Sequence, residues 1–197
     1  MPKGEDMKRF FLTLLLAGLI MNGLSAKTAV VYFSATGTTE KMAKTAAEVL
    51  EADIFEIHPV HKYTEADLNW HDKNSLTTIE SKDPKARPEI KAVVSSLQQG
   101  SETTDSSTAF EISGYDTVIL CYPIWWAYAP KIMYTFVESQ DWSGKKLITL
   151  CTSGGSKIGR SGSDLVKFAN GADFKGGKDF TRGNGEKIKK FVEGSLN

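Results

Sequence analysis

The segment Ser34-Ala35-Thr36-Gly37-Thr38-Thr39 has the residue types of an anion-binding loop and lies between an expected strand and an expected helix. Four of its six residues carry hydroxyl groups, and its glycine allows a tight turn. The free N–H groups and the dipole of a helix start favour an anion, to which hydroxyls add donors. The segment therefore predicts a neutral phosphate cradle, and the structural alternative is a threonine cap with polar neighbours. It has neither the Gly-x4-Gly-Lys pattern of triphosphate loops nor a G-x-G-x-x-G pattern.

A second segment, Pro123-Ile124-Trp125-Trp126, places bulky apolar side chains just past the end of an expected strand. An aromatic ring there can cover a planar ligand, and such stacking stabilises a contact beyond the area it buries. Adjacent residues of an extended segment point in opposite directions, so one tryptophan is expected on the ligand and the other on the following helix. Trp125 is nearer the strand end and is the expected ligand contact; the alternative is that both rings only seal the core.

The third segment, Thr152-Ser153-Gly154-Gly155-Ser156, is rich in glycine, so its backbone can approach a ligand closely. A plain connection between a strand and a helix is the alternative.

Strands and helices are expected to alternate after Lys27. Short runs of Val, Ile and Leu predict buried parallel strands, and apolar residues at helical spacing predict helices. The expected strands are 28–33, 53–57, 117–122, 146–151 and 173–180, and the expected helices are 38–50, 89–97, 130–140, 161–169 and 185–192. Five strands that alternate with helices predict a doubly wound parallel α/β sheet with helices on both faces.

The polar stretch 59–88 is expected to be irregular and able to form a lid, and the Ser/Thr-rich stretch 100–108 to be a mobile surface loop. Ligands of doubly wound sheets bind beyond the carboxyl ends of the strands. The three segments described above follow the first, third and fourth expected strands, which makes them one candidate site.

Composition fits one globular domain of 197 residues, 41% apolar and 24% charged. The 24 basic and 24 acidic residues balance, so the basic excess of a nucleic-acid-binding protein is missing. Residues 1–26 have the charged, apolar and small-residue order of a secretory signal, which predicts export, cleavage after Ala26 and no stable membrane insertion afterwards. An uncleaved membrane anchor is the alternative. The mature chain, 27–197, then has 21 basic and 22 acidic residues.

A family resemblance adds to this interpretation. The run from Tyr32 to Thr39 resembles the FMN (flavin mononucleotide) phosphate loop of flavodoxins. Cys121-Tyr-Pro-Ile-Trp-Trp126 and the run from Cys151 to Ser161 resemble the second and third flavin loops of one flavodoxin-like branch, in the right order. The resemblance implies the strand order 2-1-3-4-5 and non-covalently bound FMN. The implied cofactor contacts are Ser34, Ala35, Thr36, Gly37, Thr38, Thr39, Pro123, Ile124, Trp125, Trp126, Thr152, Ser153, Gly154, Gly155 and Gly159.

The chain departs from the family pattern in two places. The third loop has no aromatic residue to cover the second flavin face, so Tyr63, Trp70 or Tyr128 fills that side or the face stays open to a substrate. Ala127 stands where relatives often have glycine, and its Cβ hinders a backbone flip toward the flavin.

Histidine and cysteine do not indicate further chemistry. His58 and His61 lie near one another, but Pro59 intervenes and no cluster of other ligands accompanies them, so no metal site is expected. Cys121 and Cys151 are expected to be buried free thiols.

Three functions remain open. An FMN-binding electron carrier, which needs a redox partner protein, is favoured, and no catalytic residue is assigned. An FMN-dependent NAD(P)H:quinone-type oxidoreductase with a small quinone-like acceptor is the alternative, and a flavin-binding protein without redox turnover is the third.

Overall fold

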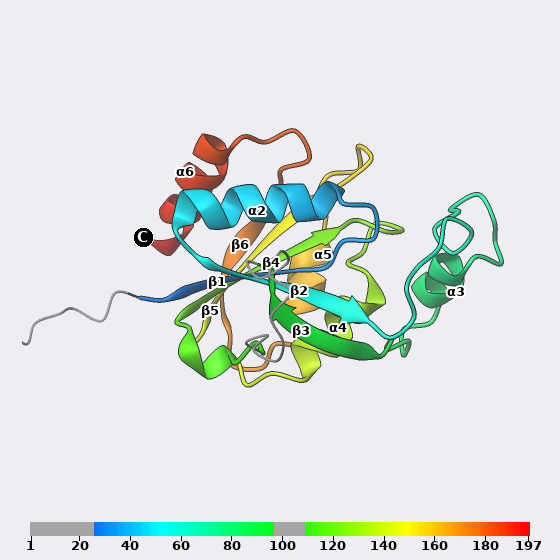
Figure 1. Cartoon of the computed structure of the whole chain (residues 1–197), viewed down its shortest axis with the longest axis horizontal. Helices are drawn as coiled ribbons and strands as arrows, with labels where there is room; N and C mark the ends of the chain where they lie inside the picture. The colour runs from blue at the N-terminus through cyan, green and yellow to red at the C-terminus, as the bar shows by residue number, and fades with distance from the viewer. Residues whose placement is uncertain (1–25, 97–108) are drawn as a thin grey trace, which may run out of the picture.

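The computed structural model describes residues 26–96 and 109–197, and its centre is a six-stranded sheet in the order β3-β2-β1-β4-β5-β6 (Figure 1). The strands are β1 (Thr28–Tyr32), β2 (Asp53–Pro59), β3 (Ile90–Ser95), β4 (Thr117–Pro123), β5 (Lys146–Thr152) and β6 (Asp173–Asp179). The helices are α2 (Thr38–Leu50), α3 (Leu76–Lys82), α4 (Lys131–Glu138), α5 (Ser161–Val166) and α6 (Gly185–Leu196), with a 3-10 turn η2 (Ile112–Gly114). The expected signal segment before Ala26 and the expected mobile loop 100–108 lie outside the described residues.

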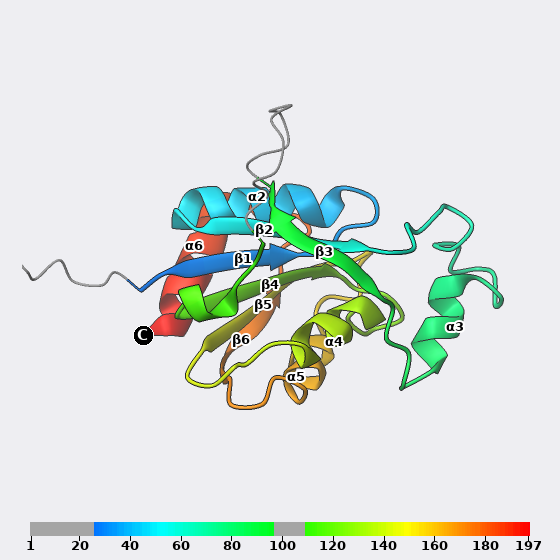
Figure 2. The same cartoon turned by 60° about the horizontal axis from the view of Figure 1, so that its bottom comes forward.

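Helices cover both faces of the sheet, as predicted. Helices α2 and α6 lie on one face, and α4 and α5 lie on the other (Figure 2). Successive side chains of a strand point to opposite faces, and β1 contributes buried residues to both cores. Ala29 and Val31 belong to the core under α4 and α5, whereas Val30 and Tyr32 belong to the core under α2 and α6. Burial on both faces is why these strands are continuous apolar runs.

The prediction of a helix at residues 89–97 is wrong. Residues 90–95 form the edge strand β3, which pairs antiparallel with β2. The sheet is therefore mixed and has six strands, not the five parallel strands that were expected. The additional strand extends the predicted order at the β2 edge, and the five parallel strands follow the order β2-β1-β4-β5-β6. Val93 and Val94 are β-branched and suit a strand, and the unpaired edge of β2 supplies their backbone hydrogen bonds. Helical spacing of apolar residues over so short a run was a weak guide.

The two cysteines point to opposite faces of the sheet. Cys121 of β4 pairs in register with Leu150, and Cys151 is the next residue of β5. Cys121 accordingly packs under α2 and α6, and Cys151 packs under α4 and α5. Both are free and buried, which confirms the expectation of two unpaired thiols.

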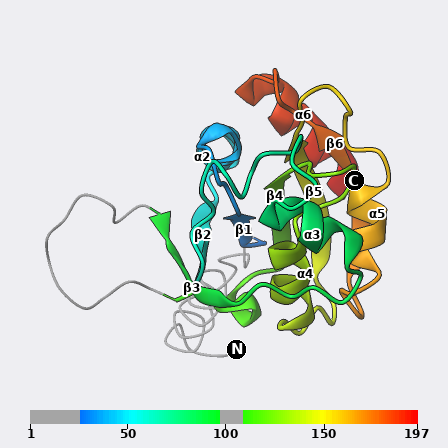
Figure 3. The same cartoon turned by 90° about the vertical axis from the view of Figure 1, so that its right-hand side faces the viewer.

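Helix α3 stands beyond the carboxyl ends of the strands, at the edge where the three candidate loops begin (Figures 1 and 3). It lies inside the stretch 59–88, in which no helix was expected. Ser75 precedes it and shares a buried hydrogen bond of 2.8 Å with Thr78, which stabilises the first turn. Within the described residues, no helix has the length and apolar character needed to cross a membrane.

Candidate functional site

The first loop ends in a helix start whose donors are free. Gly37, at φ 83°, is the residue before α2 and adopts a left-handed conformation that favours glycine. Its N–H donates to Ser34 Oγ at 3.1 Å, and its carbonyl accepts the N–H of Lys41 at 3.0 Å. The earlier N–H groups of α2 have no carbonyl one turn back, and no side chain caps them. These donors can therefore receive an anion.

The four hydroxyls of this loop divide into two pairs. Ser34 closes the turn through Gly37, and buried Thr39 shares a 2.8 Å hydrogen bond with Thr152 of the third loop. Thr36 and Thr38 are exposed, and their hydroxyls bond to no residue in the described part of the chain. One pair therefore holds the loop in place, and the other pair is available to a ligand.

The second loop is a tight two-residue turn. Trp125 and Tyr128 exchange backbone hydrogen bonds of 3.0 and 2.9 Å, and Trp126 and Ala127 between them have φ values of 53° and 66°. Positive φ at both central residues is the pattern of a type I′ turn. Residues other than glycine are strained there by about 1–3 kcal/mol each. The loop that follows β4 therefore stores backbone strain at the position of Ala127.

The two tryptophans of this loop have different surroundings. Trp125 is half-buried and packs edge-on against Phe33 and Tyr63, with ring centroids 5.6 and 5.1 Å away. Trp126 is 40% exposed, so the expectation that it packs on the following helix is wrong. The turn conformation explains the difference, because it breaks the alternation of an extended segment and leaves Trp126 at the tip.

The third loop is held by residues that the sequence did not single out. Ser153 donates its hydroxyl to Asp179, and its N–H donates to Thr181 Oγ1 at 2.6 Å. Ser153 Oγ also accepts the N–H of Lys157 at 3.0 Å. Partial burial opposes ionisation of Asp179, but the hydrogen bonds from Ser153 and Thr181 outweigh it and lower the pKa of this carboxyl. Asp179 is the last residue of β6 and Thr181 follows that strand, and this placement was the available signal for them.

The glycines of the third loop leave room for a ligand. Gly155 and Gly159 have φ values of 130° and 50°. A Cβ at Gly154, Gly155 or Gly159 would meet no atom within 4 Å, so these positions border open space. The backbone can therefore be approached closely from outside.

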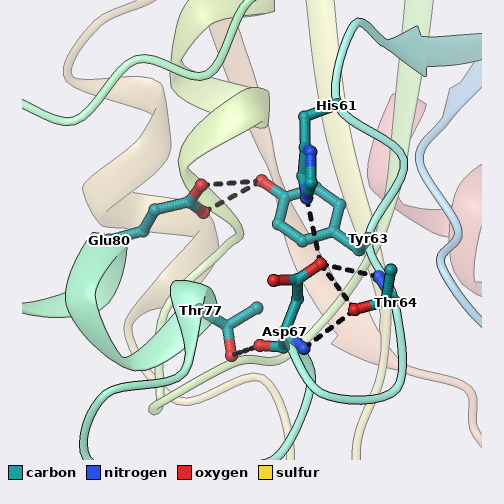
Figure 4. A network of polar contacts seen from close by, with 6 residues as sticks. All are labelled: His61, Tyr63, Thr64, Asp67, Thr77 and Glu80. Atoms are coloured by element: carbon teal, nitrogen blue, oxygen red, sulfur yellow. Dashed lines mark hydrogen bonds and ion pairs between the residues drawn. The ribbon is translucent and has the colours of Figure 1, made fainter.

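A polar network fastens α3 to the chain that follows β2 (Figure 4). The Tyr63 hydroxyl donates to the Glu80 carboxylate, 3.1 and 2.9 Å from its two oxygens. Asp67 Oδ2 accepts the N–H and hydroxyl of Thr64, both at 2.8 Å, and lies 2.9 Å from His61 Nε2. Thr77 of α3 donates its hydroxyl to the Asp67 carbonyl at 2.8 Å. The chain that precedes α3 is thereby tied to the helix itself.

This network reaches the aromatic residues of the first two loops through Tyr63. The ring of Tyr63 packs on Phe33 as well as on Trp125, and a cavity of about 550 Å3 lies between Tyr63, Glu80 and the chain at Pro59. Burial raises the pKa of Tyr63, as does the nearby Glu80 charge, and burial also raises the pKa of Glu80. Tyr63 therefore packs within this aromatic cluster and is bonded to α3 through Glu80.

The other two aromatic candidates are exposed. Trp70 is 65% exposed and lies over His71, and Tyr128 is 47% exposed beside the second loop. Among the described residues no group of three or more His, Cys, Asp and Glu side chains is arranged to hold a metal ion.

Comparisons with known proteins agree with this geometry. A family model described as Flavodoxin matches residues 27–195. A candidate flavoprotein of Bacteroides eggerthii is 35% identical, with 88% of this chain and 99% of that chain covered and a TM-score of 0.74. A second one, from Bacteroides uniformis, is 38% identical, with 85% and 98% covered and a TM-score of 0.70.

A more distant structure, a flavoprotein of Lactobacillus acidophilus in complex with FMN, is 20% identical and has a TM-score of 0.60 over 85% of this chain and 99% of that chain. No match was found among curated proteins. The extent of the family match shows that this chain belongs to the flavodoxin family.

The raised pKa of Glu80 predicts a pH-dependent component of stability. The folded chain keeps a proton there at a pH at which the unfolded chain, near the ordinary value of 4.5, has released it. This stabilising contribution is complete below that value and is lost as the pH rises through the raised pKa. Glu80→Gln should therefore flatten the fall of melting temperature that begins near the ordinary value of 4.5 and continues as the pH rises through the raised pKa.

The matched control is Glu89→Gln, which changes another carboxylate that lines the same cavity. Its profile should follow the wild type. A Glu80→Gln profile as steep as that of the wild type would contradict the assignment.

Proposed function

We propose that this protein is an electron carrier whose FMN is held by the three loops at the carboxyl edge of the sheet. The chain is an FMN-binding, flavodoxin-like protein by family. One observation carries the assignment of the phosphate end: the uncapped start of α2 with the free hydroxyls of Thr36 and Thr38. The Tyr-Pro-Ile-Trp-Trp second loop supports membership of the branch that shares it.

The residues of the chain fit FMN. Donors without partners at the α2 start suit a phosphate, and the open glycine backbone of the third loop suits the pyrimidine end of the flavin. The exposed ring of Trp126 is free to cover the flavin, whereas Trp125 already packs on Phe33 and Tyr63. When bound, FMN supplies reversible transfer of one or two electrons. The protein holds it, excludes water from one face and presents it to a partner.

The main alternative is a reductase that passes hydride from NAD(P)H to a small quinone-like acceptor. The cavity of about 550 Å3 under α3 favours it, because a carrier has no need of a substrate pocket. The carrier is preferred because the features of the three loops, namely free donors at the α2 start, an open glycine backbone and an exposed ring, account for FMN binding by themselves.

Turnover separates the two functions. The FMN-loaded carrier should oxidise neither NADH nor NADPH in the presence of a quinone, and it should accept and return electrons with a protein acceptor. Steady-state oxidation of NAD(P)H that depends on the quinone would favour the reductase. Protein isolated from its native compartment without a flavin absorption band would instead favour a protein without redox turnover.

Loss of a free hydroxyl should weaken FMN binding. A hydrogen bond to a charged group contributes about 1.5–3 kcal/mol, so Thr36→Ala and Thr38→Ala should each lower FMN affinity about 10- to 100-fold. The measurement is titration of FMN into apoprotein, with Ser195→Ala on α6 as a control that leaves affinity unchanged. Wild-type affinity in both threonine variants would remove the phosphate assignment.

The two tryptophans should respond differently to truncation. Trp126→Ala should lower FMN affinity about tenfold and leave the melting temperature close to that of the wild type, because the exposed ring contributes mainly stacking. Trp125→Ala should destabilise the fold by about 2–4 kcal/mol, because it removes a half-buried ring from its aromatic contacts. Flavin fluorescence and thermal denaturation measure the two effects, and the reverse pattern would assign the flavin contact to Trp125.

The proposal includes export and cleavage after Ala26. The order of residue types in 1–26 supports it, and so does the chain that follows. The N–H of Lys27 donates to the Asp116 carboxylate at 2.9 Å, so an ammonium created there by cleavage would face a carboxylate. Mass spectrometry of the mature protein should find Lys27 at the N-terminus, and an intact terminus in a cytoplasmic fraction would overturn the proposal.

A further inference from the structure

A cavity of about 620 Å3 adjoins the phosphate loop on the side of α6. Thr36 and Thr38 of the first loop line one wall, and Thr181 and Arg182, which follow β6, line the wall opposite. Lys41, one turn into α2, completes the charged part of the lining. Segments from the two ends of the described chain therefore meet around the uncapped helix start.

The lining of this cavity is cationic. It includes two cations and several hydroxyls but no Asp or Glu side chain. Some cations elsewhere are paired with acids: Lys44 lies 2.6 Å from Glu40, and Arg87 lies 2.7 Å from Glu138. Neither Lys41 nor Arg182 forms an ion pair with an acid in the described ranges 26–96 and 109–197. Their charges are therefore not neutralised by the protein itself.

Two acidic groups on the segments that line this cavity are already engaged. Glu40, in the first turn of α2, is bound to Lys44, and Asp179 accepts hydrogen bonds from Ser153 and Thr181. Neither of these two carboxylates forms an ion pair with Lys41 or Arg182, and the helix dipole adds a partial positive charge at the start of α2.

The chain at Arg182 is held in place by its neighbours. The N–H of Phe180 donates to the Cys151 carbonyl at 2.9 Å, and the N–H of Gly183 donates to the Phe180 carbonyl at 2.9 Å. Thr181 bonds to Ser153 of the third loop in both directions. Arg182 is thus attached to the frame that carries the third loop.

We propose that Arg182 and Lys41 bind the phosphate group of the cofactor, from outside the phosphate loop. The inference rests on the proposed FMN site. It adds positive charge to the phosphate end of that site, because the first loop alone has no cation. A phosphate monoester carries a charge of about −1.5 to −2 at neutral pH, and the planar guanidinium of Arg182 can donate two parallel hydrogen bonds to it. Lys41 contributes a point charge on the other wall. The pair makes the site selective for a phosphorylated flavin over riboflavin.

The test compares FMN with riboflavin on apoprotein of the wild type and of Arg182→Gln, Lys41→Gln and the double variant. Affinity is measured by quenching of flavin fluorescence at low and at high salt. Arg182→Gln should weaken FMN about 5- to 30-fold at low salt, Lys41→Gln about 3- to 10-fold, and both effects should shrink at high salt. Riboflavin affinity should stay within about twofold of the wild-type value, because riboflavin carries no phosphate.

Lys190→Gln on α6 is the matched control, since it removes the same charge away from the cavity and should leave FMN affinity unchanged. Arg182→Lys should recover part of the FMN affinity that Arg182→Gln loses. Such a recovery would show that the loss comes from the missing charge and not from damage to the fold. Inorganic phosphate should raise the melting temperature of the wild-type apoprotein more than that of the double variant.

Each other outcome has its own meaning. FMN affinity in Arg182→Gln and Lys41→Gln equal to that of the control would overturn this inference and leave the FMN site intact. Equal losses of FMN and riboflavin would also overturn it, because they would indicate damage to the loops. A folded wild-type apoprotein that binds neither flavin would instead refute the proposed function.

Discussion

Parallel pairing of β1 with β4, and of β4 with β5, is the constraint on which the whole candidate site depends. It aligns Tyr32 with Cys121 and Pro123 with Thr152, so that three strands end at one edge of the sheet. The pairing continues past the strands, because the N–H of Phe33 donates to the Cys121 carbonyl at 3.0 Å and that of Ile124 to the Thr152 carbonyl at 2.7 Å. Three loops that are far apart in sequence therefore leave the sheet as neighbours.

Polar groups at this edge either brace the loops or remain free for a ligand. Thr39 and Thr152 join the first loop to the third, and Ser153 joins the third loop to the chain after β6. Thr36 and Thr38, by contrast, keep their hydroxyls exposed. A buried hydroxyl without a hydrogen-bond partner destabilises the fold, whereas an exposed hydroxyl without a protein partner is solvated by water and remains available to a ligand. The buried hydroxyls are therefore the ones that bond within the protein, and the exposed hydroxyls are the ones left for a ligand.

The segment between β2 and β3 adds an element to the doubly wound sheet. It carries α3, whose Glu80 receives the Tyr63 hydroxyl, and Tyr63 in turn packs on Phe33 and Trp125. Backbone strain at Trp126 and Ala127 lies next to this aromatic contact. The packing of Trp125 holds one end of the strained turn, which is how a fold can keep such a conformation at a binding loop.

The amino-acid sequence by itself determined the features that depend on residues close together in the chain. The buried strands, the hydroxyl-rich start of α2 and the glycine-rich third loop were all predicted, because apolar runs and turn residues act locally. Tertiary structure alone decided that 90–95 pairs with β2 as a strand and that Trp125 is half-buried while Trp126 is exposed. It also decided that Asp179 bonds to the third loop and that Arg182 lines a cavity with the first loop. Those outcomes depend on contacts between distant segments, where a free sheet edge or a packed ring outweighs local preference.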